Sequence, residues 1–297
     1  MQKSKISSVG SERLPYKQDV AGSNPASSTN FNYKTKMSKI LIIPDIHHRT
    51  FWKDCVKNID DFDKVVFLGD YLDPYKFEGD EVSDMDAGFL NLKEIMKFKE
   101  ENSEKVVLLL GNHDLHYIYP GINSGRYDTE NGQRNIDCFS YNLGLFDIAY
   151  ECEVNGKRVF FSHASVLKSW VEKYDWLFKT NGELPKAEQF NSYIHYDKTN
   201  DKKDWDNSQF IEALDKVSYF RGGYDVFGSM IWSDVREHLT GRCEEYENVF
   251  QIFSHTYINF PVVTKDFACL DVQRGFILED GVVKEMDGTI VEMKDYN

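Results

Sequence analysis

Short runs of apolar residues, each followed by a polar segment, recur along the chain. Three of them lie near the start of the patterned region, at residues 40–44, 65–68 and 106–110. Runs of four or five apolar residues bounded by polar ones are typical of strands that are covered on both faces. We therefore expect three buried strands in this part of the chain.

A helical pattern separates the second and third of these runs. Within residues 86–101, Phe89, Leu92 and Ile95 follow one another at the three-residue spacing that places apolar side chains on one helix face. A shorter helix is expected at residues 54–60, between the first two strands. Strand, helix and strand in this order predict parallel strands joined by right-handed crossovers.

The rest of the chain mixes loops, helices and strands. Residues 115–141 are rich in Pro, Gly and Asn turn signals, so they predict a long loop, and long loops in compact domains are often functional. An Asn-Gly turn at residues 155–156 predicts a β-hairpin made of residues 146–150 and 158–161. Further elements are expected as helices at residues 165–180 and 186–219 and as strands at residues 249–253, 267–272, 276–279 and 282–285.

Residues 1–36 differ from everything that follows. Ser, Asn, Gly, Lys and Pro dominate there without periodicity, so we expect a disordered N-terminal tail. Residues 20–26 resemble the mistaken translation of the end of a transfer-RNA gene, which makes Met37 an alternative start, while a genuine flexible tail stays open. Residues 37–297 are then expected to form a single domain with a helical insertion at about residues 165–219.

Composition and charge limit the classes of partner. The chain has 297 residues, of which 41% are hydrophobic, enough for one large core or two modest domains. Its formal net charge is −14, from 35 basic and 49 acidic residues. Because binding to a nucleic-acid backbone needs basic surface, this charge disfavours nucleic acid as the main partner.

Cysteine usage and hydropathy indicate the compartment. The five cysteines are scattered and form no C-x-x-C pair, which favours reduced thiols over a disulfide framework or a zinc knuckle. No apolar run approaches the length of a membrane span, and the N-terminus has no hydrophobic signal core. We expect a cytoplasmic protein that does not bind a membrane.

Five apolar runs end in side chains that can bind a cation or transfer a proton. These side chains are Asp45 and His47; Asp70 and Asp73; Asn112, His113 and Asp114; His163; and His255. Any one of them alone would be an ordinary loop residue after a strand. Since open α/β folds bind ligands at the carboxyl ends of their strands, five such endings predict one shared site.

Six of these residues supply oxygen and nitrogen donors without any thiolate. They are Asp45, His47, Asp70, Asn112, His163 and His255. Carboxylate, amide and imidazole donors suit Mn²⁺, Fe or Zn²⁺ and sometimes Mg²⁺. Six ligands with one shared carboxylate are enough for two ions about 3.5–4 Å apart, a spacing that clamps the attacking and leaving oxygens in displacement at phosphorus.

The order of these residues resembles a known signature. Its five motifs are Asp45-x-His47, Gly69-Asp70-x-x-Asp73, Gly111-Asn112-His113-Asp114, His163 and Ser254-His255-Thr256. Together they resemble the calcineurin-like metallophosphoesterases and cover nearly all of the chain after the tail. The resemblance implies an α/β (α+β) fold, namely a four-layer αββα sandwich with two mixed β-sheets and a metal site at the strand carboxyl ends.

The resemblance also implies a role for each residue. The implied ligands are Asp45 and His47 for the first metal, Asp70 for both metals, and Asn112, His163 and His255 for the second metal. His113 would protonate the leaving-group oxygen, and Asp73 would orient that histidine. The Gly-Asp-Tyr-x-Asp pattern at residues 69–73 and the Trp-Ser-Asp segment at residues 232–234 are closest to the serine/threonine protein phosphatase branch.

Three positions depart from that branch or from the wider family. Pro74-Tyr75 stand where the branch has Arg-Gly, and Leu110 stands where an arginine precedes the Gly-Asn-His block. Tyr257 takes the place of a second histidine that many family members have in the late motif, so the first metal is expected to keep water ligands.

The phosphate-binding arginines of the branch are thus missing from their usual positions. Arg221 and Arg126 are the residues that we expect to contact the substrate in their place, and Arg134 is a further candidate. A surface role stays open for each of the three.

The expected function is hydrolysis of a phosphate ester, preferably a monoester, by a hydroxide that bridges two divalent metal ions, with Mn²⁺ favoured over Fe, Zn²⁺ or Mg²⁺. The phosphorylated substrate is left open between a small molecule, a nucleotide and a phosphoprotein, and so is the oligomeric state. Alternatives are a nuclease or other phosphodiesterase, a dinucleoside polyphosphate hydrolase, and a metal-poor scaffold without activity.

Several polar residues lie outside the signature. His48, His116, His195 and His238 are expected to be satisfied surface or core histidines. Asp114 is expected to brace its loop and Asp271 to cap a late strand.

Overall fold

The computed structural model describes residues 39–75, 83–119, 121–122, 125–195 and 201–294, and for residues 201–206 it describes the backbone alone. The expected disordered tail at residues 1–36 and the alternative start at Met37 lie outside the described residues. The expected single domain and its helical insertion remain predictions.

The first sheet has the strand order β11-β10-β1-β2-β3-β4. Its strands are β1 (Lys39–Ile43), β2 (Lys64–Phe67), β3 (Val106–Leu109), β4 (Phe146–Asp147), β10 (Phe276–Glu279) and β11 (Val282–Glu285). β1, β2, β3 and β4 pair in parallel, whereas β10 runs antiparallel to β1 and to β11. The parallel pairing predicted for the first three strands is therefore confirmed.

The second sheet has the order β5-β6-β7-β9-β8 and is also mixed. Its strands are β5 (Ala149–Val154), β6 (Lys157–Ser162), β7 (Val249–Phe253), β8 (Val262–Val263) and β9 (Phe267–Cys269). β6, β7 and β9 are parallel, while β5 and β8 pair antiparallel at the two edges.

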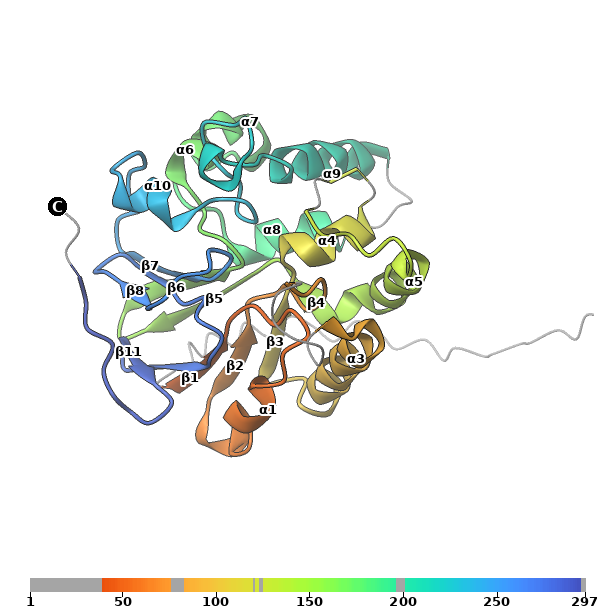
Figure 1. Ribbon diagram of the computed structural model, residues 1–297. Coiled ribbons are helices and arrows are strands. Elements are labelled where there is room, and N and C mark those ends of the chain that lie inside the picture. The colour runs from red at the N-terminus through yellow and green to blue at the C-terminus, as the bar shows by residue number, and fades with distance from the viewer. Residues whose placement is uncertain (1–38, 76–82, 120, 123–124, 196–200, 295–297) are drawn as a thin grey trace, which may run out of the picture. The chain divides into compact units, whose positions relative to one another are not determined.

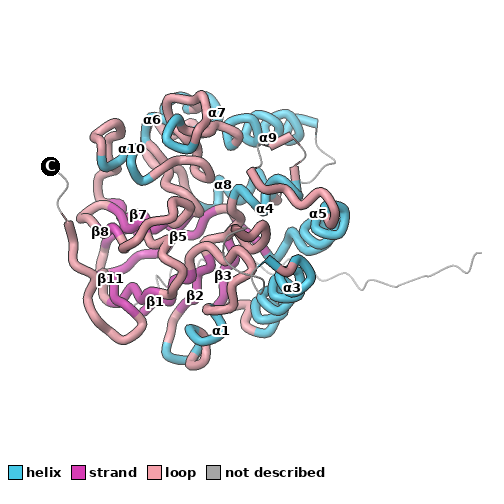
Figure 2. The backbone as a smooth tube through the Cα atoms, viewed as in Figure 1, coloured by secondary structure: helices cyan, strands magenta, loops and turns pink. Residues whose placement is uncertain are grey.

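Strand alternation builds the layers. Ile40 and Ile42 of β1 pack with residues of the second sheet in one apolar cluster, whereas Leu41 and Ile43 point to the opposite face and pack among helices. This is the two-residue period of a strand buried on both faces. The two sheets thus lie face to face, and the strands gather in the centre of the described fold in Figure 2.

Helices cover the outer face of each sheet. The helices are α1 (Trp52–Cys55), α3 (Met85–Glu101), α4 (Asn112–Ile118), α5 (Gly132–Asn142), α6 (Lys168–Lys173), α7 (Asp175–Phe178), α8 (Ala187–Ile194), α9 (Asp201–Leu214) and α10 (Val235–Leu239), with short 3₁₀ turns η1 (Ile59–Asp61), η2 (Leu143–Leu145) and η3 (Tyr219–Arg221). Figure 1 shows α1 and α3 beside the first sheet and α6, α7 and α10 beyond the second. The predicted four-layer sandwich with two mixed sheets is confirmed.

The hairpin prediction was correct in its turn but not in its first strand. β5 and β6 pair across the Asn155-Gly156 turn, as expected. However, Phe146 and Asp147 do not belong to the hairpin, because they pair with β3 in the first sheet. The chain changes sheets at Ile148, where the side chain of Asn191 accepts hydrogen bonds from two successive backbone N–H groups.

The predicted long loop at residues 115–141 was wrong over much of its length. α4 begins at Asn112 and α5 occupies Gly132–Asn142, so the expected turn signal at residues 131–132 marks the start of a helix. A helix of seven residues is too short to give a periodic signal, and α5 buries the polar Asn135 beside Cys138 and Phe139.

The expected helical segments at residues 165–180 and 186–219 contain α6 to α9, broken into shorter pieces. No helix in the described part of the chain has the length and apolar character that a bilayer crossing requires.

Candidate metal centre

Two glycines allow the strand ends of the site to approach each other. Gly69 follows β2 with φ +105, and a Cβ at this position would lie 2.5 Å from the backbone nitrogen of Gly111. At Gly111, which follows β3, a Cβ would lie 2.1 Å from Oδ1 of Asp70. Any larger residue would push these two loops apart, so both glycines are required by the close approach.

Asp114 braces its own loop, as expected, and also ties it to the loop after β2. Its carboxylate accepts hydrogen bonds from the backbone N–H groups of Asp70 (2.8 Å), Tyr71 (3.0 Å) and Gly111 (2.8 Å). It is fully buried. Asp114 therefore positions the loops after β2 and β3.

Four predicted site residues adopt a left-handed backbone conformation. The φ angles are 40° at His47, 52° at Asp70, 59° at Asp73 and 63° at His255. Residues with a Cβ rarely hold this conformation, which costs about 1–3 kcal/mol each and collects at functional sites. The surrounding packing thus maintains local strain in order to aim these side chains.

The six predicted metal ligands lie together. We call these residues the donor cluster: Asp45, His47, Asp70, Asn112, His163 and His255. Each is no more than 2% exposed. Two groups of ligand atoms within 4.8 Å of one another overlap there, Asp45–His47–Asp70 and Asp70–His163–His255.

Asp70 occupies the middle of the donor cluster. Its Oδ2 lies 3.4 Å from Nε2 of His47 and 3.5 Å from Nε2 of His163, while Oδ1 accepts a hydrogen bond of 2.9 Å from the backbone N–H of His113. Burial raises the pKa of this carboxyl, whereas the hydrogen bond from the backbone of His113 lowers it. Asp70 is the carboxylate shared by both groups of ligand atoms.

The tautomer of His163 is set by the backbone. Its Nδ1 lies 2.9 Å from the carbonyl oxygen of Leu68, which can only accept, so Nδ1 carries the proton. Its Nε2 then presents a lone pair, 3.0 Å from Oδ1 of Asn112 and 3.0 Å from Nδ1 of His255. Two acceptor atoms, Nε2 of His163 and Oδ1 of Asn112, therefore face one another at short range.

The tautomer of His47 is set by the backbone in the same way. Its Nδ1 donates to the carbonyl oxygen of Leu72 at 2.8 Å, which leaves the lone pair of Nε2 facing Asp70 and, at 3.9 Å, Oδ2 of Asp45. Oδ1 of Asp45 accepts hydrogen bonds from the side chain of Ser254 and the backbone of His255. A backbone-anchored imidazole whose second nitrogen presents a lone pair is the usual arrangement of a histidine metal ligand.

His255 leaves a buried atom without a partner. No hydrogen-bond partner lies within reach of its Nε2 among the described residues. Burial lowers the pKa of this histidine well below its usual value, and Arg221 and the neighbouring histidines lower the pKa further. A neutral buried imidazole, together with converging acceptor atoms, fits divalent cations bound by oxygen and nitrogen donors.

His113 lies beside the donor cluster and is held by Asp73. Its Nδ1 is 2.9 Å from Oδ2 of Asp73, and the same oxygen lies 2.8 Å from Nε2 of His116. The hydroxyl of Tyr117 donates to Oδ1 of Asp73 at 2.6 Å. Burial opposes these interactions, yet they lower the pKa of Asp73 to about 2, so it is a carboxylate.

Sequence reasoning missed two partners of Asp73. His116, expected to be an ordinary satisfied histidine, and Tyr117 both contact this carboxylate from α4. Their spacing after His113 is the signal that was available, because residues three and four apart lie on the same helix face. That signal depends on recognising α4 as a helix.

Of the candidate arginines, Arg126 reaches the donor cluster. Its Nη2 lies 3.3 Å from Nε2 of His47 and 3.1 Å from Nε2 of His113. The guanidinium carbon stands 3.6 Å from the ring centre of Tyr75. Tyr75, one of the departures from the phosphatase pattern, thus supports the arginine.

The other two arginines differ in position. Arg221 lies 3.8 Å from the carboxylate of Asp234 and is close enough to lower the pKa of His255, so it borders the donor cluster. Arg134 pairs with Asp86 at 2.5 Å and lies over the ring of Phe89. The contacts of Arg134 are therefore on α3, with residues outside the donor cluster.

Two further residues near the site differ from their expected roles. Asp271 is 3% exposed, and Asp45, Arg49 and Arg221 all affect its pKa, which burial raises well above the usual value. It therefore borders the donor cluster rather than simply capping a strand. Tyr257, at the position of the missing histidine, is 54% exposed.

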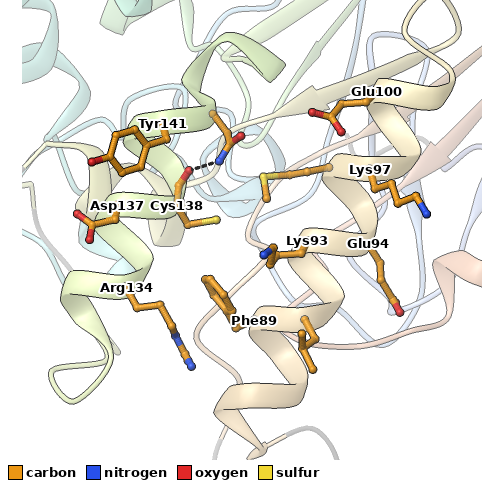
Figure 3. Close-up of a pocket in the computed structure, with 12 residues that line it drawn as sticks. Phe89, Lys93, Glu94, Lys97, Glu100, Arg134, Asp137, Cys138 and Tyr141 are labelled. Carbon is orange, nitrogen blue, oxygen red and sulfur yellow. Dashed lines mark hydrogen bonds between the residues drawn. The ribbon is translucent and has the colours of Figure 1, made fainter. Parts of the chain in front are cut away.

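An open groove lies elsewhere, between α3 and α5. It encloses about 1010 Å³ and is lined by residues such as Phe89, Lys93, Glu100 and Tyr141 (Figure 3). Arg134 also lines it, but no member of the donor cluster does. The groove and the donor cluster are thus separate features.

A comparison with protein families finds a match over most of the chain. The family described as Calcineurin-like phosphoesterase matches residues 38–259, which include the whole donor cluster, Asp73 and His113. The comparison with curated proteins finds no match.

Solved structures with a similar fold include a cold-active protein-tyrosine phosphatase of the psychrophile Shewanella sp. It aligns with a TM-score of 0.51 and 13% identity, covering 86% of this chain and 80% of that chain. A point mutant of a cold-active protein tyrosine phosphatase aligns with a TM-score of 0.52 and 12% identity, covering 86% of this chain and 80% of that chain. The phosphoesterase Yfce from E. coli aligns with a TM-score of 0.37 and 12% identity, covering 87% of this chain and 100% of that chain.

Proposed function

The chain belongs to the calcineurin-like phosphoesterase family, hydrolases that act on phosphate esters, and from this premise we propose that it is a metal-dependent phosphatase for monoesters. The proposed ligands are Asp45 and His47 for a first divalent cation, Asp70 for both cations, and Asn112, His163 and His255 for a second. Bound cations would supply an activated water and positive charge opposite the phosphoryl oxygens.

The observation that carries this proposal is which ring nitrogens carry protons in the two histidines beside Asp70. The Nε2 atoms of His47 and His163 both present lone pairs toward its carboxylate, because backbone carbonyls hold the protons on Nδ1. Lone pairs and a carboxylate facing one another in a dry site repel unless positive charge lies between them. Bound cations would relieve this repulsion in the donor cluster.

His113 is the proposed proton donor to the leaving-group oxygen. With Nδ1 donating to Asp73, the opposite nitrogen Nε2 points to the space between His113, His47 and Arg126. The carboxylate of Asp73 stabilises the protonated imidazole, and proton transfer from Nε2 would leave the alcohol neutral as it departs. His116 and Tyr117 keep Asp73 in place.

Arg126 is the proposed contact to the phosphoryl group. A guanidinium suits phosphate because its parallel N–H groups can donate to two oxygens at once. Nη2 of Arg126 lies within hydrogen-bond distance of Nε2 of His47 and of His113, and a phosphate would be a stronger acceptor in the same position. Arg221 is the second proposed substrate contact, since it borders the opposite side of the cluster beside His255.

The test compares two ester types under defined metal loading. Protein stripped with a chelator is reloaded separately with Mn²⁺, Fe²⁺, Zn²⁺ or Mg²⁺ and assayed on p-nitrophenyl phosphate and bis(p-nitrophenyl) phosphate. We expect the monoester to be hydrolysed faster, and Mn²⁺ to give the highest rate.

Other outcomes would replace the proposal. Preference for the diester would favour the phosphodiesterase alternative. Absence of turnover with every metal, combined with failure to retain any, would favour the scaffold without activity. Phosphopeptides and nucleotides tested next would narrow the substrate class.

A further inference from the structure

A hollow of about 200 Å³ lies between the second sheet and the hairpin of β10 and β11. Its lining side chains come from β5, β6, β7, β8, β11 and the segment after β11. Most of them are valines, so we call the hollow the valine pocket, and these valines are Val154, Val159, Val263, Val282, Val283 and Val291.

The valine pocket is separate from the donor cluster. β6 begins at Lys157, which lines the pocket, and its last residue directly precedes His163. At a rise of about 3.3 Å per residue, the length of β6 separates these two positions by roughly 16 Å. None of the described residues that line the pocket belongs to the donor cluster.

The last described segment of the chain closes the pocket on one side. Residues 289–294 run beside β11 and β8, which are edge strands of the two sheets (Figure 1). The backbone N–H of Val291 donates to the carbonyl oxygen of Val283 at 3.0 Å, and that of Lys294 donates to the carbonyl oxygen of Val263 at 2.8 Å. Backbone hydrogen bonds therefore hold this wall in place.

The walls and the rim of the pocket differ in exposure. Val159 and Val283 are each 2% exposed, so the inner part is apolar and dry. At the rim, Val282, Ile290 and Met293 are 40%, 60% and 70% exposed. A water molecule among these valines would find few polar partners, whereas an apolar group would also cover the exposed rim. The pocket therefore favours an apolar occupant.

Both charged residues that line the pocket are lysines. Nζ of Lys157 lies 5.3 Å from the ring centre of Phe250 and donates to the carbonyl oxygen of Lys265 at 2.7 Å. An ammonium has three N–H donors, so Lys157 can bind a further acceptor. Lys265 lies 3.9 Å from the carboxylate of Asp266, which does not line the pocket. In a chain with a net charge of −14, this lining favours an anionic group at the pocket.

The volume limits the size of the ligand. An apolar cavity of about 150 Å³ holds one benzene molecule, whereas pockets for drug-sized ligands enclose about 300–1,000 Å³. The valine pocket, at about 200 Å³, therefore fits a single ring or a short alkyl chain.

We propose that the valine pocket binds a small monocarboxylate whose apolar part is one aromatic ring or a short alkyl chain. The apolar part would lie among the valines, and Nζ of Lys157 would donate to the carboxylate. The bound molecule would also cover part of Val282, Ile290 and Met293. The proposal does not depend on the proposed phosphatase activity.

The test compares phenylacetate with its neutral analogue phenylacetamide in ligand-observed NMR titrations. The proteins are the parent, Lys157→Met, which keeps an apolar stem without the charge, and Lys216→Met. Lys216 is the matched control, because its side chain is 23% exposed and does not line the pocket. Each titration is repeated with inorganic phosphate, which would displace a carboxylate from the donor cluster. Melting temperatures show whether the variants fold.

We expect the parent and Lys216→Met to bind phenylacetate equally and Lys157→Met to bind it about tenfold more weakly, because a hydrogen bond between charged groups is lost. Phenylacetamide should bind the parent about tenfold more weakly than phenylacetate, a comparison that needs no variant. Phosphate should change neither affinity. Nuclear Overhauser effects should connect the phenyl ring to valine methyl groups.

Several outcomes would overturn the proposal. They are absence of phenylacetate binding, equal affinity for the acid and the amide, equal affinity of the parent and a folded Lys157→Met, and displacement of phenylacetate by phosphate. Sedimentation analysis tests whether a second copy of the chain covers the rim instead. A parent dimer that Ile290→Glu dissociates would contradict the proposal, because the rim would then be an interface between copies.

Discussion

At the scale of single residues, hydrogen bonds to the backbone determine the chemistry of the donor cluster. The carbonyl oxygens of Leu68 and Leu72 each accept from an Nδ1, and in doing so they direct the Nε2 lone pairs of His163 and His47 inward. In the proposed metal centre, the nitrogen that would bind a cation is thus selected in advance. His113 differs, because its Nδ1 donates to a carboxylate that can stabilise an added proton.

Replacing His113 by alanine tests its role as a proton donor. We expect kcat to fall about 10²- to 10⁴-fold, because general acid catalysis contributes by that order. Metal content should not change, since this histidine is outside the donor cluster. Steady-state kinetics and metal analysis would measure both, with His195→Ala as a control at a histidine outside the donor cluster. Loss of metal together with activity would contradict the assigned role.

Replacing Arg126 by alanine tests the proposed phosphate contact. A hydrogen bond to a charged group contributes about 1.5–3 kcal/mol, so kcat/KM on a phosphate monoester should fall about 10- to 100-fold. The change should appear mainly in KM, and free phosphate should inhibit the variant more weakly. Arg134→Ala, whose side chain pairs with Asp86, should behave like the parent. Equal kcat/KM in both variants would rule out the contact.

At the scale of elements, the site depends on how closely the loops after β2 and β3 approach. Gly69 and Gly111 make the approach sterically possible, and Asp114 joins the loops through three backbone N–H groups. A second connection joins α8 to the first sheet, where Nε2 of His195 lies 3.2 Å from Oδ1 of Asp147 on β4. These contacts place elements that are far apart in sequence.

Gly111→Ala is expected to damage both folding and metal binding. Its Cβ would overlap Oδ1 of Asp70, which must move, so we expect a loss of about 1–3 kcal/mol in the free energy of unfolding and weaker metal retention. Denaturant titration and metal analysis would measure these. Gly144→Ala is the control, since a Cβ there meets no atom within 4 Å. Parent-like stability and metal content in Gly111→Ala would show that the loops are not closely constrained.

The pair formed by His195 and Asp147 should make stability depend on pH. The hydrogen bond to Asp147 raises the pKa of His195 above 6.5, against a smaller opposing effect of burial. The pair therefore stabilises the fold fully below pH 6.5, and the contribution is lost as pH rises through the folded pKa. The difference in unfolding free energy between the parent and Asp147→Asn should shrink as pH increases. His195→Gln should show the same trend, and a difference that grows with pH would refute this linkage.

At the scale of the whole molecule, the donor cluster joins both sheets. Asp45 and Asp70 follow strands of the first sheet, whereas His163 and His255 follow β6 and β7 of the second. Cations bound at this junction would connect the two halves of the sandwich. Their binding energy would then contribute to global stability.

Chelation is therefore expected to lower the melting temperature. A ligand at one hundred times its Kd stabilises the folded state by about 2.7 kcal/mol for each site. Calorimetry of protein saturated with Mn²⁺ and of protein stripped with a chelator would measure the shift, and re-addition of Mn²⁺ should reverse it. Asp70→Asn should respond much less than the parent. A parent melting temperature that is unaffected by Mn²⁺ would be inconsistent with cations at the junction.

Local sequence patterns predicted many of the strands and the members of the donor cluster. The apolar runs predicted β1, β2, β3, β6 and β7, and the polar residues at their ends identified all six members of the donor cluster. Such information is local, because a buried strand and the polar residues that follow it can be recognised from consecutive positions in the sequence. The order of motifs was sufficient to indicate the fold.

Long-range contacts decided the rest. The sequence left Arg221 and Arg126 as the expected substrate contacts, with Arg134 as a further candidate. Only the position of Tyr75 and the fold of the long segment placed Arg126 beside His47 and His113. Phe146 was assigned to the wrong sheet because strand partners are chosen by packing across the molecule rather than by neighbours in sequence. Composition and order therefore determined which chemistry the chain carries, whereas the tertiary structure decided which side chains meet, because those contacts join residues that local patterns cannot relate.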